Sequence, residues 1–319
     1  MLNTEDFYKL ISNDDDLIDQ LVEWRIIKSP ESTKCYACSG ACTLRMRKRK
    51  TQATYNLRCK ECKNEFSLFK GTFFAFEDEN NRTVMRLPIQ KVLRIIFYYF
   101  EGKTYKEIST LAEVKSVKTI TLWCNFVREH IHCHLEKEII GGDGKIIEID
   151  ESLMRGKRKS NKGRYLLGDV LDMNPANNSR KNNYGTREDG PWVFGMVEKG
   201  TRKLKLFYVE DRKASTLVPI LRQNVHPGST LWSDEWRGYR GINEFFASHQ
   251  TVKHAENFVD PETGVNTQLI ECIWSHAKLH ILRNRKGTNL TLLQSHLSFF
   301  CFLYRYKHSS AFEEFMKIL

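Results

Sequence analysis

Residues 146–152 read IIEIDES, an apolar strand pattern that ends in acids. Side chains alternate between the two faces of a strand, so Asp150 is predicted to share a face with Glu148 and Glu151 to lie on the opposite face with the isoleucines. A carboxylate at the end of an apolar strand costs stability unless it has a partner or a function. This stretch therefore predicts a buried strand that delivers an acid to a site.

The elements around this strand predict a mixed α/β domain over residues 141–310. Further short strands are expected at Trp192–Val197, Leu204–Val209 and Thr230–Trp232, and helices at Ala214–Asn224 and Thr267–Leu282. Strands with helices interposed later are typical of mixed α/β folds. The glycine-rich run at 141–144 is a plausible boundary, and the polar stretch at 166–190 is interpreted as a loop insertion.

Two further acids occupy comparable positions. Asp234 ends the apolar strand in LWSDEW, and Glu271 lies on a helix between apolar neighbours in QLIECIW. Two acids on strands and one on a helix can converge on a pair of Mg²⁺ ions, which prefer carboxylate oxygens. Periodicity does not show convergence, so the alternative is that Asp150, Asp234 and Glu271 are ordinary surface acids.

Two CxxC pairs precede this domain. Cys35 and Cys38 form the first pair, and Cys59 and Cys62 form the second. Two such turns complete a tetrahedral site for one structural zinc ion, and residues 31–76 are predicted to form a zinc ribbon. The alternative is free or redox-active cysteines. Cys42 is an additional cysteine, which would take the place of Cys38 as a zinc ligand only if the first CxxC turn were irregular.

A run of cations lies between the two pairs. On a ribbon it would present positive charge to DNA phosphates. Its members are Arg45, Arg47, Lys48, Arg49 and Lys50. A solvated basic loop or a nuclear-import signal gives the same pattern, and these interpretations are compatible with one another.

Helical patterns flank the ribbon. Residues 1–30 are predicted to form a helical segment, with Asp14–Asp16 capping a helix start. Residues 87–140 resemble a helix-turn-helix whose second helix begins at Ser116 or Val117 and presents Lys118 to the major groove. An ordinary helical hairpin is the competing interpretation.

The composition favours a polyanionic partner. The 319-residue chain has 50 Lys and Arg against 39 Asp and Glu, a net charge of +11. Such a surplus indicates nucleic acid first, although a merely soluble basic protein remains an alternative. No run approaches the roughly 18 apolar residues of a membrane span. We expect no membrane partner, and a location in the nucleus in a eukaryote or with the nucleoid otherwise.

Other residues are secondary candidates. Basic side chains after the first acid and on the helix of the third could hold the DNA backbone, or could simply be solvated; they are Lys157, Arg158, Lys159, Arg164 and Lys278. His254 is interpreted either as an aid to proton transfer or as a structural histidine. Three tryptophans have apolar neighbours and are predicted to be core residues rather than base-stacking ones; they are Trp232, Trp236 and Trp274.

The order of these motifs resembles the Merlin superfamily of DDE transposases and its insertion-sequence relatives. The resemblance runs from about Cys35 to Tyr306 and includes IEIDES, GKRKSNKGR, WVFGMVE, PGSTLWSDEWRGY and HAENFVDPETGVNTQLIECIW. Its most specific part is the FVDPETG…NT…IE..W run. Relatives often have His-Thr-Asn before the Ile-Glu, whereas this chain has Val265–Gln268 there.

The resemblance implies a ribonuclease-H-like catalytic core, a mixed sheet flanked by helices, preceded by the ribbon and the helix-turn-helix. It implies cut-and-paste transposition through Mg²⁺- or Mn²⁺-dependent strand cleavage and transfer, with Asp150, Asp234 and Glu271 sharing two ions. The partners would be transposon ends, target DNA and further copies of the chain. The alternatives are a domesticated DNA-binding regulator with an idle core, and a nuclease that cleaves without joining.

Overall fold

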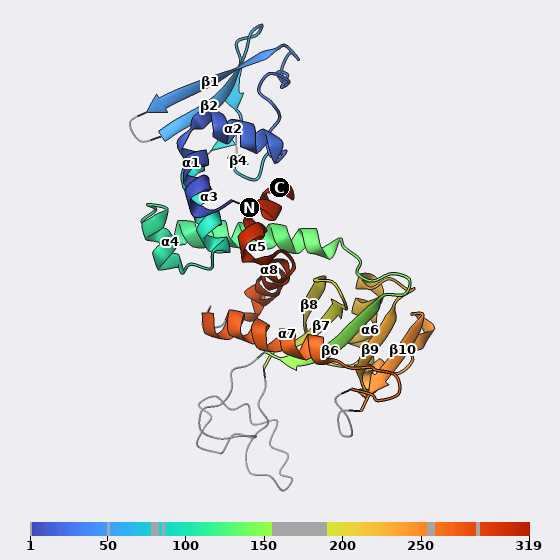
Figure 1. Ribbon diagram of the computed structural model, residues 1–319. Helices are drawn as coiled ribbons and strands as arrows, with labels where there is room; N and C mark the ends of the chain where they lie inside the picture. Colours follow the sequence, from blue (N-terminus) through green and yellow to red (C-terminus); the bar gives the residue numbers. More distant parts are fainter. Residues whose placement is uncertain are drawn as a thin grey trace, which may run out of the picture. The chain divides into compact units, whose positions relative to one another are not determined.

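The computed structural model describes residues 2–49, 52–77, 83–84, 87–154, 190–253, 259–284 and 288–319. The chain divides into two compact units (Figure 1). Unit 1 comprises Met1–His134 and Phe302–Leu319, and unit 2 comprises Leu135–Cys301. The N-terminal helices, the cysteine-rich segment and most of the helical segment therefore share one unit. No helix in the described ranges combines the length and the apolar character needed to cross a membrane.

Unit 1 begins with α1 (Thr4–Ser12) and α2 (Asp14–Glu23). The N-cap of α2 is Asn13, whose side chain accepts a hydrogen bond from the Asp15 N–H, so Asp14–Asp16 form the first turn instead of the predicted cap. The correction has a simple cause: a side-chain oxygen one residue earlier satisfies a free N–H, while acids inside the first turn favour the helix dipole.

A three-stranded antiparallel sheet follows in the order β1-β2-β3, with β1 at Cys42–Arg49, β2 at Gln52–Cys59 and β3 at Glu65–Ser67. The β1–β2 register pairs Leu44 with Leu57 and Met46 with Tyr55. Tyr55 and Leu57 are buried, whereas the alternate residues face solvent, so one face of the hairpin is apolar and the other polar. A short pair, β4 (Phe76–Glu77) and β5 (Thr83–Val84), ends the segment.

The helical part of unit 1 contains α3 (Ile89–Phe100), α4 (Tyr105–Leu111) and α5 (Val117–Glu136). Thr104 and Glu107 form a capping box at the start of α4. Glu113, in the turn before α5, has a left-handed backbone conformation with φ 53°. At the start of α5, Ser116 Oγ accepts a hydrogen bond from the Thr119 N–H. The core is aromatic; for example, the rings of Phe7 and Phe97 stack with centroids 4.1 Å apart.

Unit 2 contains a five-stranded mixed sheet in the order β10-β9-β6-β7-β8. The strands are β6 (Ile146–Leu153), β7 (Trp192–Glu198), β8 (Leu204–Val209), β9 (Thr230–Asp234) and β10 (Ser248–Val252). Strand β7 is antiparallel to both of its neighbours, β6 and β8. Strand β9 is parallel to both of its neighbours, β6 and β10. The α/β prediction is confirmed in this coarse form.

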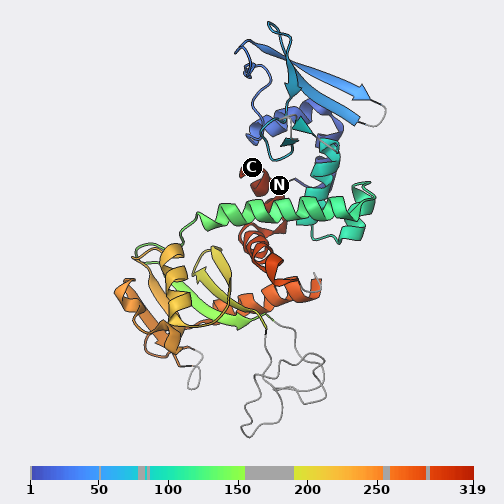
Figure 2. The same ribbon diagram turned by 180° about the vertical axis from the view of Figure 1, so that it is seen from behind.

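Helices flank this sheet, which Figures 1 and 2 show from opposite sides. Helix α6 (Ala214–Asn224) and the short turns η2 (Arg237–Tyr239) and η3 (Ile242–Glu244) contribute to the core on one face, where Ile147 and Ile149 of β6 pack with Leu217 and Leu221 of α6. Helix α7 (Gln268–Lys278), which continues as the π-helix η4 (Leu279–Asn284), contacts β6 and β7. The long α8 (Leu290–Lys317) belongs partly to each unit.

Gly195 of β7 allows α7 to lie directly on the sheet. A Cβ at this position would meet the indole of Trp274 at 2.7 Å and Ile270 Cδ1 at 3.0 Å, closer than side chains normally approach. Gly195 is paired with Asp150 of β6. The glycine in WVFG therefore brings the helix of the third candidate acid against the strand of the first.

Candidate active site and zinc site

The first two candidate acids lie on adjacent parallel strands. The β6–β9 register pairs Ile147 with Leu231 and Glu148 with Trp232, and its continuation by two residues sets Asp150 beside Asp234. Both acids are half-buried. Because the two strands are parallel, their carboxyl ends meet at one edge of the sheet, and both carboxylates are delivered there by rigid backbone.

The third candidate acid, Glu271, is in the first turn of α7, which is fixed to β6 at two points. The indole Nε1–H of Trp274 donates to Asp150 Oδ2 at 2.8 Å. The backbone N–H groups of Leu269 and Ile270 donate to Glu148 Oε2 at 3.0 and 3.1 Å. Glu148 and Asp150 thus share the face of β6 that meets α7, as the alternation predicts.

The β6–β9 register and the hydrogen bond from Trp274 place β9 and α7, which carry the other two acids, against the strand of Asp150. Burial raises the pKa of Asp150 to about 6, and the charges of Asp234 and Glu271 add to the increase against the lowering effect of the Trp274 hydrogen bond. The like charges disfavour ionisation together unless a cation lies among them. A donor set of carboxylate oxygens that raise one another's pKa fits Mg²⁺ in its chemistry.

The three carboxylates are not drawn into a tight cluster. Among the described His, Cys, Asp and Glu residues, only one group of three or more has all its ligand atoms within 4.8 Å of one another. That group is the four cysteines, and it does not include the three acids. Each acid instead has a protein donor: Asp234 Oδ1 accepts from the Trp236 N–H at 3.0 Å, and Glu271 Oε1 accepts from the buried Thr267 hydroxyl at 2.8 Å. A two-ion site does not require its carboxylate oxygens to lie this close to one another, because the two ions are themselves about 4 Å apart.

The loop before α7 has its own hydrogen-bonded structure. Asp260 Oδ1 accepts from the backbone N–H groups of Glu262 and Thr263 and from the Thr263 hydroxyl, and the chain closes through a Gly264 N–H bond to the Asp260 carbonyl. Gly264 has φ +72°, which suits glycine. The VDPETG segment thus forms a compact turn that leads to the start of the helix carrying Glu271.

Glu148 was not predicted as a functional residue, yet it occupies the centre of this arrangement. Its side chain is buried, and it supplies the cap that the N-cap residue Thr267 does not provide. Lys199 Nζ lies 3.9 Å from Glu148 Oε1 and 4.0 Å from the centre of the Trp232 ring. The sequence signal was present, because a buried acid on an otherwise apolar strand requires a partner.

We expect the Glu148→Ala variant to destabilise the chain by about 1–3 kcal/mol, because two N–H groups at the start of α7 lose their acceptor and the helix is no longer fixed to β6. Glu148→Gln keeps an acceptor oxygen and should recover most of that stability. The free energy of unfolding, measured by urea denaturation of the full chain, checks this. Equal losses in the two variants would contradict a role through the hydrogen bonds.

Glu151 lies on the opposite face of β6, as the alternation predicts, but it interacts with a buried residue and with the candidate acids. It accepts a hydrogen bond from the hydroxyl of the buried Tyr239. Burial raises the pKa of Glu151 to about 7, and the charges of Asp150 and Asp234 contribute to the increase. Glu235, by contrast, is exposed.

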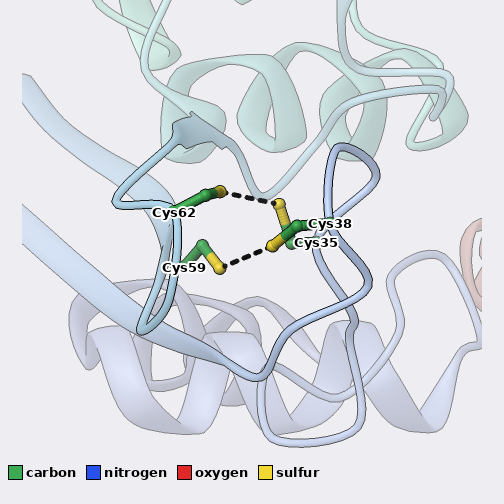
Figure 3. Close-up of side chains that lie close together, drawn as sticks. All are labelled: Cys35, Cys38, Cys59 and Cys62. Atoms are coloured by element: carbon green, nitrogen blue, oxygen red, sulfur yellow. Dashed lines mark hydrogen bonds between the residues drawn. The ribbon is translucent and has the colours of Figure 1, made fainter.

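The zinc ribbon cysteines converge as the spacing predicts. The Sγ atoms of Cys35 and Cys62 are 3.6 Å apart, and those of Cys38 and Cys59 are 3.4 Å apart (Figure 3). Four sulfurs around zinc at about 2.3 Å would be roughly 3.8 Å from one another. The group therefore fits one tetrahedral zinc ion.

Cys42 is close to this group but outside it, so the first CxxC turn is regular. Burial raises the pKa of the Cys42 thiol, and nearby Cys59, Cys35 and Cys38 add to the increase. Within the cluster, burial raises the pKa of Cys59, but backbone N–H donors of Cys62 and Glu61 outweigh it and lower the pKa to about 7. N–H groups directed at sulfur are appropriate for a metal-bound thiolate.

The remaining candidates are distributed over both units. Arg45 and Lys118 are exposed, and Arg47 forms an ion pair with Glu65 at 2.9 Å. Lys278 is half-buried in the last turn of α7. Lys48 and Arg49 belong to β1, but their side chains are outside the description. Five further candidates lie outside the described residues altogether; they are Lys50, Lys157, Arg158, Lys159 and Arg164. His254 does so too.

The three tryptophans differ in environment. Trp232 and Trp274 are buried, as predicted for core residues. Trp236 is 37% exposed, so its core interpretation was wrong. The reason is its position in the turn after β9, where its ring lies beside Arg212 and its Nε1–H donates to the Arg212 carbonyl oxygen.

Comparison with known proteins identifies the family of unit 2. A family model described as the ISXO2-like transposase domain matches residues 143–306. The chain belongs to this transposase family. The matched region begins within the glycine-rich turn before β6 and includes Asp150, Asp234 and Glu271.

One curated relative supports the same family. An uncharacterized transposase-like protein of Haemophilus influenzae is 30% identical over 79 residues. The alignment covers 25% of this chain and 63% of the relative, so the chain spans less than two thirds of the relative that it matches.

Proposed function

We propose that this protein is a DDE transposase that binds transposon ends and catalyses Mg²⁺-dependent DNA strand cleavage and transfer. The observation that carries the proposal is the placement of Asp150 and Asp234 on adjacent parallel strands, with α7, which carries Glu271, hydrogen-bonded to Asp150 through Trp274. Membership in the ISXO2-like transposase family supports the reaction class. The strand order, with one antiparallel neighbour of β6 and one parallel neighbour, supports a ribonuclease-H-like core, and we propose that the chain is of the Merlin type on its sequence motifs alone.

The residues of the proposed site have separate tasks. Asp150 and Asp234 would hold the ions on rigid strands, and Glu271 would complete the site from α7. Bound Mg²⁺ would help to activate the attacking water or hydroxyl and stabilise the leaving oxygen. Trp274 orients Asp150, Thr267 orients Glu271, and Glu148 holds the helix that carries Glu271.

Unit 1 would supply end recognition. The exposed face of the β1–β2 hairpin pairs Arg45 with Asn56 and Thr43 with Arg58, so Arg45 and Arg58 share one polar face. The sequence analysis missed Arg58 because it lies outside the basic run and joins it only through strand pairing. Lys118 in the first turn of α5 is a second exposed cation. The same proposal includes several copies of the chain acting on DNA.

We expect the double variant Arg45→Ala/Arg58→Ala to bind DNA with a shallower salt dependence. Each lost phosphate contact should reduce the slope of log affinity against log salt by about 0.9. Fluorescence anisotropy with a labelled duplex over a salt series measures this slope. Lys9→Ala is the control, because Lys9 is already paired with Glu5 on α1. Identical slopes in the double variant and the wild type would remove the hairpin from the DNA interface.

Cleavage of a DNA duplex that carries a transposon end tests whether the protein is an enzyme. The proposed transposase requires a divalent ion and the three acids, whereas a DNA-binding regulator with the same fold binds the duplex and leaves it intact.

A further inference from the structure

We propose that Arg212, held between the indole rings of Trp192 and Trp236, binds a phosphate of the DNA backbone beside the acid site. The inference rests on the proposed function, because it requires DNA as substrate, and it adds a binding residue that the motifs do not include. We refer to Trp192, Arg212 and Trp236 as the indole–arginine stack.

The guanidinium of Arg212 is confined by two aromatic rings. Its Cζ lies 3.9 Å from the centre of the Trp192 ring and 4.4 Å from that of Trp236. Cation–π contacts of this kind fix the plane of a guanidinium. Two indole rings thus restrict the movement of one cation, which reduces the entropy lost when it binds an anion.

The backbone holds the stack together. Trp236 Nε1–H donates to the Arg212 carbonyl oxygen at 3.2 Å. At Gly238, a Cβ would meet Trp236 Nε1 at 2.7 Å and the Arg212 carbonyl oxygen at 3.0 Å. Trp192 is at the start of β7, where it pairs with Leu153 of β6 and Val209 of β8. The three residues are therefore positioned by the sheet and by a close turn rather than by loose surface contacts.

Among the described residues, Arg212 forms no salt bridge with the acid next to it in the sequence. The neighbouring acid Asp211 interacts with other residues. Its Oδ2 forms an ion pair with Lys213 Nζ at 2.8 Å, and its Oδ1 accepts a hydrogen bond from the Thr216 hydroxyl at 2.7 Å. Within the described part of the chain, the guanidinium has no carboxylate in salt-bridge range, although its charge lowers the pKa of Glu151, and its side chain is partly exposed. Rings that cover the faces of a guanidinium leave its edge of N–H donors, which matches a phosphate.

The stack lies next to the proposed site. The backbone N–H of Trp236 donates to Asp234 Oδ1 at 3.0 Å, so one residue contacts both the second acid and Arg212. A DNA strand whose reacting phosphate reaches Asp150 and Asp234 would bring a neighbouring phosphate toward this end of the sheet. A cation here would offset the repulsion between the acids and the DNA backbone.

The test compares Arg212→Ala with Arg222→Ala in the full chain. Arg222 is a matched control because it also stacks on an aromatic ring, that of Phe245 at 4.3 Å, and is in the last turn of α6. The probe is a fluorescein-labelled duplex of random sequence, titrated over a salt series. We expect Arg212→Ala to reduce the slope by about 0.9 and the low-salt affinity roughly tenfold, with Arg222→Ala unchanged. Arg212→Lys, which keeps the charge but not the planar fork, should restore the slope and only part of the affinity.

The outcomes distinguish a failure of the proposed function from a failure of the phosphate contact of Arg212. If the wild type shows no salt-dependent DNA binding, the proposed function and the phosphate contact of Arg212 are both wrong. If the wild type binds DNA and Arg212→Ala behaves like Arg222→Ala, the phosphate contact is wrong. If Trp236→Ala weakens binding of a single-stranded probe while Arg212→Ala does not, Trp236 stacks on bases and the phosphate role is overturned.

Discussion

Replacing Asp150 by Asn is expected to reduce strand cleavage roughly a thousandfold or more, with Asp234→Asn and Glu271→Gln giving losses of similar order. Each change keeps the size of the side chain and removes one formal charge from the proposed metal site. Positioning and charge stabilisation supply most of the rate in phosphoryl transfer, so a poorly held ion has a large effect. The measurement is the rate of nicking of an end-containing duplex with Mg²⁺ present.

DNA affinity should survive in these variants, because the ribbon and helices of unit 1 are separate in the chain from the acids. Glu235→Gln is the matched control, since Glu235 is exposed and adjacent to Asp234. Glu151→Gln is unsuitable as a control because Glu151 is hydrogen-bonded to the buried Tyr239 hydroxyl. Full activity in all three acid variants would refute the triad.

Loss of zinc is expected to have the second largest effect. Cys38→Ser should abolish binding of one zinc ion per chain and unfold the ribbon, since structural zinc contributes about 10–16 kcal/mol to small zinc-finger domains at neutral pH. Metal analysis of reduced protein and limited proteolysis of residues 35–67 measure the two effects. The strands of unit 2 should remain protected.

Cys42→Ser provides the matched control for the zinc experiment. Cys42 is buried close to the cluster but is not one of its four members. This variant should retain one zinc ion per chain. Zinc loss from Cys42→Ser and retention by Cys38→Ser would reverse the ligand assignment, and wild-type protein without zinc would remove the site.

Several elements were predictable because their signals are local. The apolar runs of β6, β7, β8 and β9 were all placed within a few residues, and so was α6. The cysteine pairs converge because a CxxC turn by itself directs two sulfurs at one point. The helix starts at Thr104 and Ser116 follow from capping residues that act over three positions.

Other features depend on contacts that no local pattern records. Strand β10 was missed because its sequence, SHQTV, is mostly polar and its residues are largely accessible at the edge of the sheet. The role of Glu148 as the cap of α7 joins residues 121 positions apart. The exposure of Trp236 depends on a turn after β9 rather than on its apolar neighbours.

The sequence names the candidate acids but not how they are arranged, and their role as a site stays a prediction. The sequence indicates three acids at element ends, but their proximity depends on the β6–β9 register and on Gly195 admitting α7. The present directions of the carboxylates, toward Trp274, Trp236 and Thr267, could not be predicted, because each depends on a donor supplied by tertiary packing or a local turn.

The measurement that tests the central claim most directly is cleavage of a duplex carrying the DNA ends that flank the coding sequence, with Mg²⁺ or Mn²⁺ and with chelator. The account predicts that wild-type protein cleaves only with the divalent ion, and that Asp150→Asn binds the duplex equally well but leaves it intact. Equal cleavage in chelator, or undiminished cleavage by Asp150→Asn, would contradict it.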